Sequence, residues 1–146
     1  MKELLLKLVR SDRKHLDGAL CFFRLFAGFL MLTHGWAKLS SFSTLATTFP
    51  DPLGVSSIVS LILILFAEVG CSLCIIFGFM TRLATLPLIF GMLMAIFIIH
   101  GNDPFTVREL AILYLGIFVT LLWTGAGRYS LDEIIRQKLT HREIPE

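Results

Sequence analysis

The chain has 146 residues, of which 55% are hydrophobic and 16% are charged. Soluble globular domains carry about 25% charged residues, so this composition indicates a membrane protein of one domain, residues 1–146. The net charge of +2 gives no support to nucleic-acid binding, and the 3 cysteines do not form the framework of a disulfide-stapled secreted domain. The N-terminal leucine run is interrupted by Lys7 and lacks a cleavage site, so no signal peptide is expected.

Four segments have the length and apolar character of transmembrane helices, or nearly so, since a bilayer crossing takes about 20 residues. They are expected at residues 17–39, 55–79, 83–99 and 109–124. The predicted fold is an all-α membrane protein, a four-transmembrane-helix bundle with short interfacial helices. Pro87 is expected near the first turn of the third span, where its missing N–H matters little.

Basic residues predict the orientation of the bundle. They gather before the first span, between the second and third, and after the fourth, whereas the other two loops hold only Lys38 and Arg108. Positively charged loops stay on the cytoplasmic side. Both termini are therefore expected to be cytoplasmic.

Short helices are expected around the spans. The stretch FSTLATTF, residues 42–49, predicts a short helix on the membrane surface. Thr106 and Glu109 have the spacing of a capping box for the fourth span, and Ser130 and Glu133 repeat it. The second box opens an amphipathic helix at residues 131–139, and the first ten residues are a candidate counterpart.

Two ionisable residues lie inside the spans. An unpaired charge in a membrane helix costs about 2.5–3.5 kcal/mol, so Arg24 and Glu68 need partners. A rise of about 1.5 Å per residue places them at depths within reach of each other, which predicts that they pair. Two roles stay open for Glu68: a lock between helices, or a protonatable group in a cavity.

A second group of ionisable residues is expected to converge near the outer face of the membrane, opposite the cytoplasmic termini. Its members are His34, Lys38, His100, Arg108 and Glu109. His34 and Lys38 share a helix face, although Lys38 can also snorkel to the headgroups and Glu109 can act as a cap. Gly28 and Gly35 lie on that same face and predict a close helix contact.

Cys71 and Cys74 form a C-x-x-C pair, a spacing that suggests redox chemistry. Reactive pairs usually sit at a helix N-terminus, whereas this pair lies within a span, so apolar packing is the favoured role. No metal site is expected, since no cluster of cysteine or histidine at ligand spacing accompanies it.

The pattern as a whole resembles the DoxX family of small bacterial membrane proteins, over residues 20–139. The resemblance rests on RLFAGFLMLTHGWAKL in the first span, FAEVGCSLCIIFGFMTRLATLPL in the second and third, and GAGRYSLDEII in the tail. Ala126 replaces a proline of the family's tail motif. The matching positions are Arg24, Gly28, Gly35, Lys38, Glu68, Gly70, Arg82, Arg128, Tyr129, Ser130 and Asp132.

The resemblance implies a four-helix bundle in the bacterial inner membrane, in contact with lipids. Some relatives are subunits of thiosulfate:quinone oxidoreductases, and others are linked to thiol-redox complexes. We therefore expect a membrane subunit of a redox system that binds a quinone or a similar apolar ligand, with a soluble or membrane partner supplying electrons.

The candidate residues for ligand binding or proton relay are Arg24, His34, Lys38, Glu68 and His100, with Arg108 and Glu109 behind them. The alternative is a non-catalytic scaffold or lipid-binding protein whose buried charges are structural. A small transporter ranks third, because four helices are few for alternating access and no inverted repeat is visible. Catalytic residues, the ligand itself and a homo-oligomeric state stay open.

Overall fold

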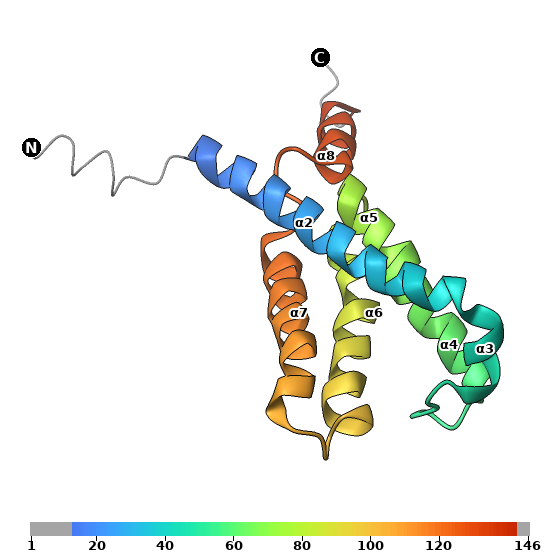
Figure 1. Cartoon of the computed structure of the whole chain (residues 1–146). Coiled ribbons are helices and arrows are strands. Elements are labelled where there is room, and N and C mark those ends of the chain that lie inside the picture. Colours follow the sequence, from blue (N-terminus) through green and yellow to red (C-terminus); the bar gives the residue numbers. More distant parts are fainter. Residues whose placement is uncertain (1–12, 143–146) are drawn as a thin grey trace, which may run out of the picture.

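A computed structural model of the chain describes residues 13–142, and every regular element within that range is helical (Figure 1). The elements are α2 (Arg13–Ser40), α3 (Phe42–Thr48), α4 (Ser57–Leu65), η1 (Phe66–Cys71), α5 (Ser72–Phe77), α6 (Thr81–Met94), η2 (Ala95–Ile99), α7 (Phe105–Thr124) and α8 (Leu131–Arg142). The η elements are π-helical segments, so α4, η1 and α5 form one continuous helix, as do α6 and η2. The first ten residues, where an interfacial helix is predicted, lie outside the described range.

Four stretches are long and apolar enough to cross a membrane, which confirms the all-α fold and the four predicted spans. They are His15–Ser40, Ser57–Phe77, Thr81–Ile99 and Phe105–Thr124. Four crossings place the start of α2 and the end of α8 on the same side, here called the terminal side. The opposite loop side carries α3 and the turn from η2 to α7 (Figure 1). Which side is cytoplasmic stays a prediction.

The first span packs antiparallel to the second through two glycines. A Cβ on Gly28 would lie 2.7 Å from Ile76 Cγ1, and a Cβ on Gly35 would lie 2.7 Å from Val69 Cγ2 and 2.9 Å from Glu68 Cβ. Real side chains do not approach so closely, so only glycine permits this backbone distance in lipid. The predicted small-residue face of α2 is confirmed, and it fixes the register between the two helices.

The bundle has an apolar interior and an apolar exterior. The interior cluster includes Met31, Ile75, Leu88, Phe118 and Leu121. Outward-facing side chains are also large and apolar: Phe22, Phe97 and Trp123 are 68%, 70% and 78% exposed. An apolar surface of this extent is expected where the helices contact lipid tails.

The start of α6 differs from the prediction. The helix begins at Thr81, so Pro87 lies inside it rather than near its first turn. The cause is remote in sequence: the carboxylate of Asp132 accepts hydrogen bonds from the backbone N–H groups of Met80 at 2.6 Å and Thr81 at 3.0 Å. These bonds satisfy amides that a helix start leaves without intrahelical partners.

The start of α7 corrects another expectation. The helix begins at Phe105, directly after Pro104, and has no side-chain cap. Thr106 therefore lies inside the helix, and the capping box predicted for Thr106 and Glu109 is wrong. Proline has a fixed φ and no N–H to satisfy, which suits it to a helix start.

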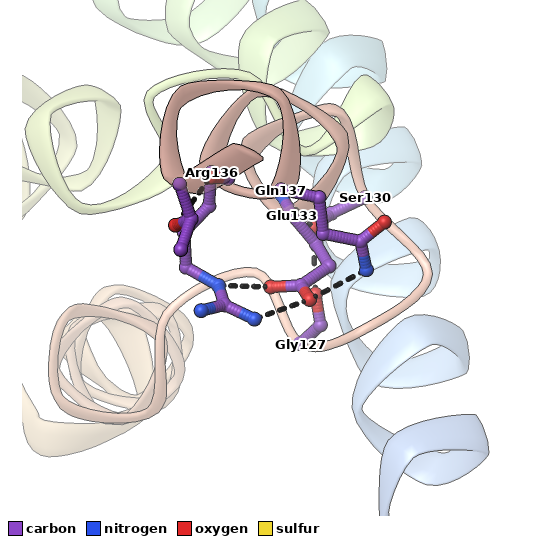
Figure 2. Close-up of polar contacts among 6 residues, drawn as sticks. Gly127, Ser130, Glu133, Arg136 and Gln137 are labelled. Carbon is purple, nitrogen blue, oxygen red and sulfur yellow. Dashed lines mark hydrogen bonds and ion pairs between the residues drawn. The ribbon is translucent and has the colours of Figure 1, made fainter. Parts of the chain in front are cut away.

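The two short helices of the prediction both form. α3 covers the FSTLATT stretch, and α8 begins after Ser130, whose Oγ accepts a hydrogen bond from the backbone N–H of Glu133 at 3.2 Å. The Glu133 carboxylate does not complete a reciprocal box; it accepts hydrogen bonds from Arg136 at 2.7 Å and Gln137 at 2.9 Å (Figure 2). The cap at Ser130 is confirmed, and only its reciprocal half is replaced.

Candidate functional site

A buried ion pair joins the first span to the second. Lys38 Nζ donates hydrogen bonds to the two carboxylate oxygens of Glu68, at 2.8 and 2.6 Å. The Glu68 side chain is 5% exposed and the Lys38 side chain 27% exposed. The predicted pairing of Arg24 with Glu68 is therefore wrong, because the partner of Glu68 comes from the loop-side end of α2.

The helix register explains this correction. Gly35 lies against Glu68, which places Lys38 one turn further along α2, whereas Arg24 lies against Gly78 at the end of α5. Arg24 and Lys38 are separated by about 21 Å of helix at a rise of about 1.5 Å per residue. The first turns of α2 extend past the end of the second span (Figure 1), so depth counted from the expected start of the helix was misleading.

Both π-helical segments lie beside ionisable residues. Glu68 lies within η1, and η2 ends at Ile99, next to His100. A π segment places an extra residue in a helical turn, and such bulges occur frequently at functional sites. The two irregular stretches of the spans also share one location, because residues from both line the same cavity.

This cavity has a volume of about 560 Å³ and lies between the second and third spans on the loop side. Lys38, Ser60, Glu68 and His100 contribute polar groups to its wall. The rest of the wall is largely apolar and includes Phe49, Leu63, Phe66, Phe90, Met94 and Ile99. A mostly apolar cavity of this size with a few convergent polar groups is typical of ligand-binding sites.

The loop between α3 and α4 closes the cavity on the loop side. Phe49 lines the cavity, and Asp51 fastens the loop by accepting hydrogen bonds from the N–H groups of Val55 at 3.1 Å and Ser56 at 2.7 Å. Ser60 Oγ donates a further bond to Asp51 at 2.7 Å, and this bond is the main cause that lowers the pKa of Asp51. Sequence reasoning missed both Asp51 and Ser60, although an aspartate between two prolines is a turn signal.

His100 connects the cavity to the loop-side surface. Its Nδ1 lies 2.7 Å from Asp103 Oδ2, and the two side chains are 38% and 46% exposed. The dyad is thus accessible from outside while His100 also contributes to the cavity wall. Asp103 was not predicted, and its only signal in the sequence is its position three residues after a histidine.

The other ionisable residues of the loop side do not reach the cavity. His34 packs edge-on against Tyr114 of α7, with ring centroids 5.6 Å apart. Arg108 donates a long hydrogen bond of 3.5 Å to the Gly101 carbonyl, and Glu109 is exposed. The predicted convergence of all five residues is therefore wrong, because their helices direct them to different neighbours.

Arg24 belongs to a separate cluster on the terminal side, the Arg24 clamp (Arg24, Gly78, Tyr129 and Asp132). Arg24 is 3% exposed, and its Nη2 donates a hydrogen bond to the Tyr129 carbonyl at 2.8 Å. Gly78 has a φ of +67°, and a Cβ there would overlap Arg24 Nη1. The backbone N–H of Asp132 donates to the Gly78 carbonyl at 2.8 Å. Within residues 13–142 no carboxylate forms an ion pair with Arg24, and the contacts that it does make join the tail to the end of the second span.

The remaining tail residues lie near the surface. Arg128 Nη1 is 3.9 Å from Asp17 Oδ2, and the Arg128 side chain is 71% exposed. Tyr129 is itself exposed and contributes its backbone carbonyl to the Arg24 clamp. The family-like tail motif therefore fastens helices together at the terminal side and does not contribute to the cavity.

The cysteine pair packs as expected. Cys71 is part of the interior cluster, Cys74 packs against that cluster, and both are free thiols. Within the described part of the chain, no group of three or more histidine, cysteine or acidic residues is arranged to hold a metal ion.

The cavity geometry suits hydrogen bonding to an apolar compound that carries an oxygen acceptor. The Lys38 ammonium has three N–H groups, and Glu68 oxygens accept two of its hydrogen bonds, which leaves a donor for a ligand.

Comparisons with known proteins agree with this architecture. A sequence model of the DoxX family matches residues 19–101, which cover most of the first span, all of the second and third, and both partners of the ion pair. The chain is 30% identical to "Inner membrane protein YqjF" of Escherichia coli (strain K12) over 119 residues, 79% of this chain and 90% of that protein. No solved structure matches the chain significantly. The chain is therefore a multi-pass membrane protein that belongs to the DoxX family.

Proposed function

We propose that this protein binds a quinone, or a similar apolar carbonyl compound, in the cavity beside the Lys38–Glu68 ion pair. The protein would act as a membrane subunit of a redox system in which a partner protein supplies the electrons. Its place would be the bacterial inner membrane, with both termini cytoplasmic, in keeping with the relative's printed name and with the distribution of basic residues.

The ion pair beside an apolar cavity is the observation that carries this proposal. A charged pair is expensive to remove from water, and a purely structural pair would gain most from close packing on every side. Glu68 is almost fully buried, yet it and Lys38 line about 560 Å³ of unfilled space. A charge inside a membrane span is costly to insert, which makes such a residue a candidate for function.

The chemistry of a quinone matches the groups in the wall. Quinone carbonyls accept hydrogen bonds, and their reduction requires protons as well as electrons. Lys38 supplies a donor, Glu68 a proton-exchanging carboxylate, and the His100–Asp103 dyad lies where protons could pass between the cavity and the loop-side surface. Apolar side chains such as Phe66 and Phe90 would contact the ring.

Binding can be tested with purified protein in lipid nanodiscs, titrated with a quinone and followed by tryptophan quenching and by thermal stabilisation. Wild-type protein should bind saturably, and Glu68→Gln or Lys38→Met should weaken binding by about tenfold, the effect of losing one hydrogen bond to a charged group. Glu109→Gln is the matched control, because the same change is made at an exposed carboxylate. An absence of saturable binding by folded wild-type protein would refute the proposal.

The alternative function is a scaffold whose charges only hold helices together. It is supported by the Arg24 clamp, in which a buried charge bonds a backbone carbonyl of the tail and lies away from the cavity. In that case the double variant Lys38→Met with Glu68→Leu should keep every measurable property of the wild type, including complex formation in the membrane.

A further inference from the structure

We propose that the ligand of the Lys38 cavity carries a long apolar chain and enters sideways from the bilayer, through a window between α4 and α6. This inference rests on the proposed function and adds the ligand class and the access route. The window consists of Leu63 and Phe66 on one side, and Phe90 and Met94 on the other. Its occupant is the isoprenoid chain of a quinone whose ring accepts hydrogen bonds.

The window residues face both the cavity and the surroundings. All four line the cavity, yet Leu63, Phe66 and Phe90 are 49%, 60% and 51% exposed. Leu63 and Phe66 are three residues apart, and Phe90 and Met94 four apart, so each pair lies on one face of its helix. A wall residue that is exposed on its outer side borders an opening, so the cavity opens between the two helices.

The depth of the window decides what can pass through it. Leu63 lies six residues after the start of α4 at Ser57, about 9 Å along the helix. Phe90 lies nine residues before Ile99, about 14 Å from the loop-side end. The hydrocarbon core of a bilayer is about 30 Å thick, so the window opens into the lipid tails of the loop-side leaflet. Only an apolar group is stable there.

The opposite wall explains why a head group would stop inside. Lys38 reaches the cavity from α2 and is held by Glu68, while Ser60 and His100 contribute further polar groups. A hydrogen-bonding head gains these partners in an environment of low polarity, where such bonds are strong. The attached chain has no polar groups that could form hydrogen bonds, so it remains in the lipid.

The remaining exits are less suitable for a lipid. The loop before α4 covers the loop-side end with Phe49, Pro50 and Pro52, and Asp51 holds this loop through three hydrogen bonds. Beside the window, the side chain of Ile64 reaches toward α6, since a Cβ at Gly91 would lie 3.0 Å from Ile64 Cδ1. The fixed loop therefore bounds the window on the loop side, and Ile64 and Gly91 line the cavity behind it.

The test compares two quinones that share one ring: a tail-free benzoquinone and the same ring with a long isoprenoid chain. Both are titrated into nanodiscs with the wild type, with Leu63→Trp, which narrows the window, and with the control Leu113→Trp on the exposed face of α7. Leu63→Trp should weaken binding of the long-chain quinone by about tenfold and that of the tail-free quinone by less than about twofold. Leu113→Trp should change neither. Partition into lipid cancels, because each ligand is compared with its own wild-type value.

A second measurement does not depend on the substitution being tolerated. A quinone with a photoreactive diazirine at the far end of its chain should label peptides of α4 and α6 only weakly, since the end lies in lipid, whereas a diazirine near the ring should label the window residues strongly. Equal effects of Leu63→Trp on both quinones, or ring-proximal labelling of α7 instead, would overturn the lateral route. Tail-free quinone that binds wild type and depends on Lys38 would then leave the proposed function standing, whereas no binding of either quinone would remove both.

Discussion

Two parts of α2, one at Arg24 and one at Lys38, place a cation in different surroundings. On the terminal side, Arg24 is enclosed by Gly78 and the tail, and it bonds a backbone carbonyl. On the loop side, Lys38 meets a carboxylate, and the pair borders a cavity. The difference teaches that ionisable residues in one membrane helix need separate explanations, because the first is enclosed by protein and bonds the tail, whereas the second pairs with a carboxylate beside unfilled space.

The largest effect should come from breaking the ion pair. Glu68→Ala leaves the ammonium of Lys38 without its partner, and removal of one member of a buried pair costs about 3–5 kcal/mol. We expect a value near the lower end, because Lys38 is 27% exposed. Reversible unfolding in mixed micelles measures the loss. Lys38→Met combined with Glu68→Leu should recover most of it, and a double variant as unstable as Glu68→Ala would contradict this account.

The independence of the Arg24 clamp from the Lys38–Glu68 ion pair can be tested by a double-mutant cycle. Because Arg24 and Glu68 share no partner, the effects of Arg24→Ala and Glu68→Ala on the free energy of unfolding should add to within about 0.5 kcal/mol. A coupling of several times that size would show that the two residues interact after all. Lys38→Ala with Glu68→Ala is the positive control, since these side chains are in contact.

An intermediate effect is expected at the Arg24 clamp. Gly78→Ala introduces a side chain at a φ of +67° and displaces the Arg24 guanidinium, so it should destabilise the fold by about 2 kcal/mol. Quinone binding by the folded fraction should be unchanged. Gly116→Ala is the matched control, because a Cβ at that position meets nothing within 4 Å. If Gly78→Ala proved as stable as Gly116→Ala, the Arg24 clamp would not contribute to the free energy of unfolding.

A smaller effect is expected at the N-terminus of α6, which is capped by Asp132 of the tail. Asp132→Ala removes the acceptor of the Met80 and Thr81 N–H groups and should cost about 1 kcal/mol, as for other helix caps. Hydrogen exchange at these two amides should increase more than exchange in α7. Asp132→Asn should lose less than Asp132→Ala, since it keeps one oxygen acceptor.

The smallest effect concerns the loop that closes the cavity. Hydrogen bonding lowers the pKa of Asp51 below its ordinary value of 3.8, so its contribution to stability is full above that value and is lost as the pH falls through the lowered pKa. Asp51→Asn should flatten this part of the acid-stability curve. The pKa of Glu133 is lowered to about 2 by Arg136 and Gln137, so this residue also titrates at low pH. Asp51 and Asp51→Asn should therefore be compared in a Glu133→Gln background.

Many residues of the site could be predicted from the sequence, but which of them pair with one another could not. Glu68, Lys38 and His100 were recognisable because ionisable residues in or beside apolar spans need partners. Their grouping depended on helix register, which a rise per residue cannot supply without a known starting point. Ser60 and Asp103 were missed since small polar residues near helix ends are common and give no distinctive signal.

The sequence by itself determined the four spans, the glycine face of α2, the helix α8 and the packing of the cysteine pair, because each follows from local composition or spacing. Only the tertiary structure decided which charge meets which. Gly28 and Gly35 set how far α2 slides along the second span, and that slide brings Lys38 to Glu68 and Arg24 to Gly78. A contact between distant segments depends on how both helices pack, and that packing cannot be read from either segment alone.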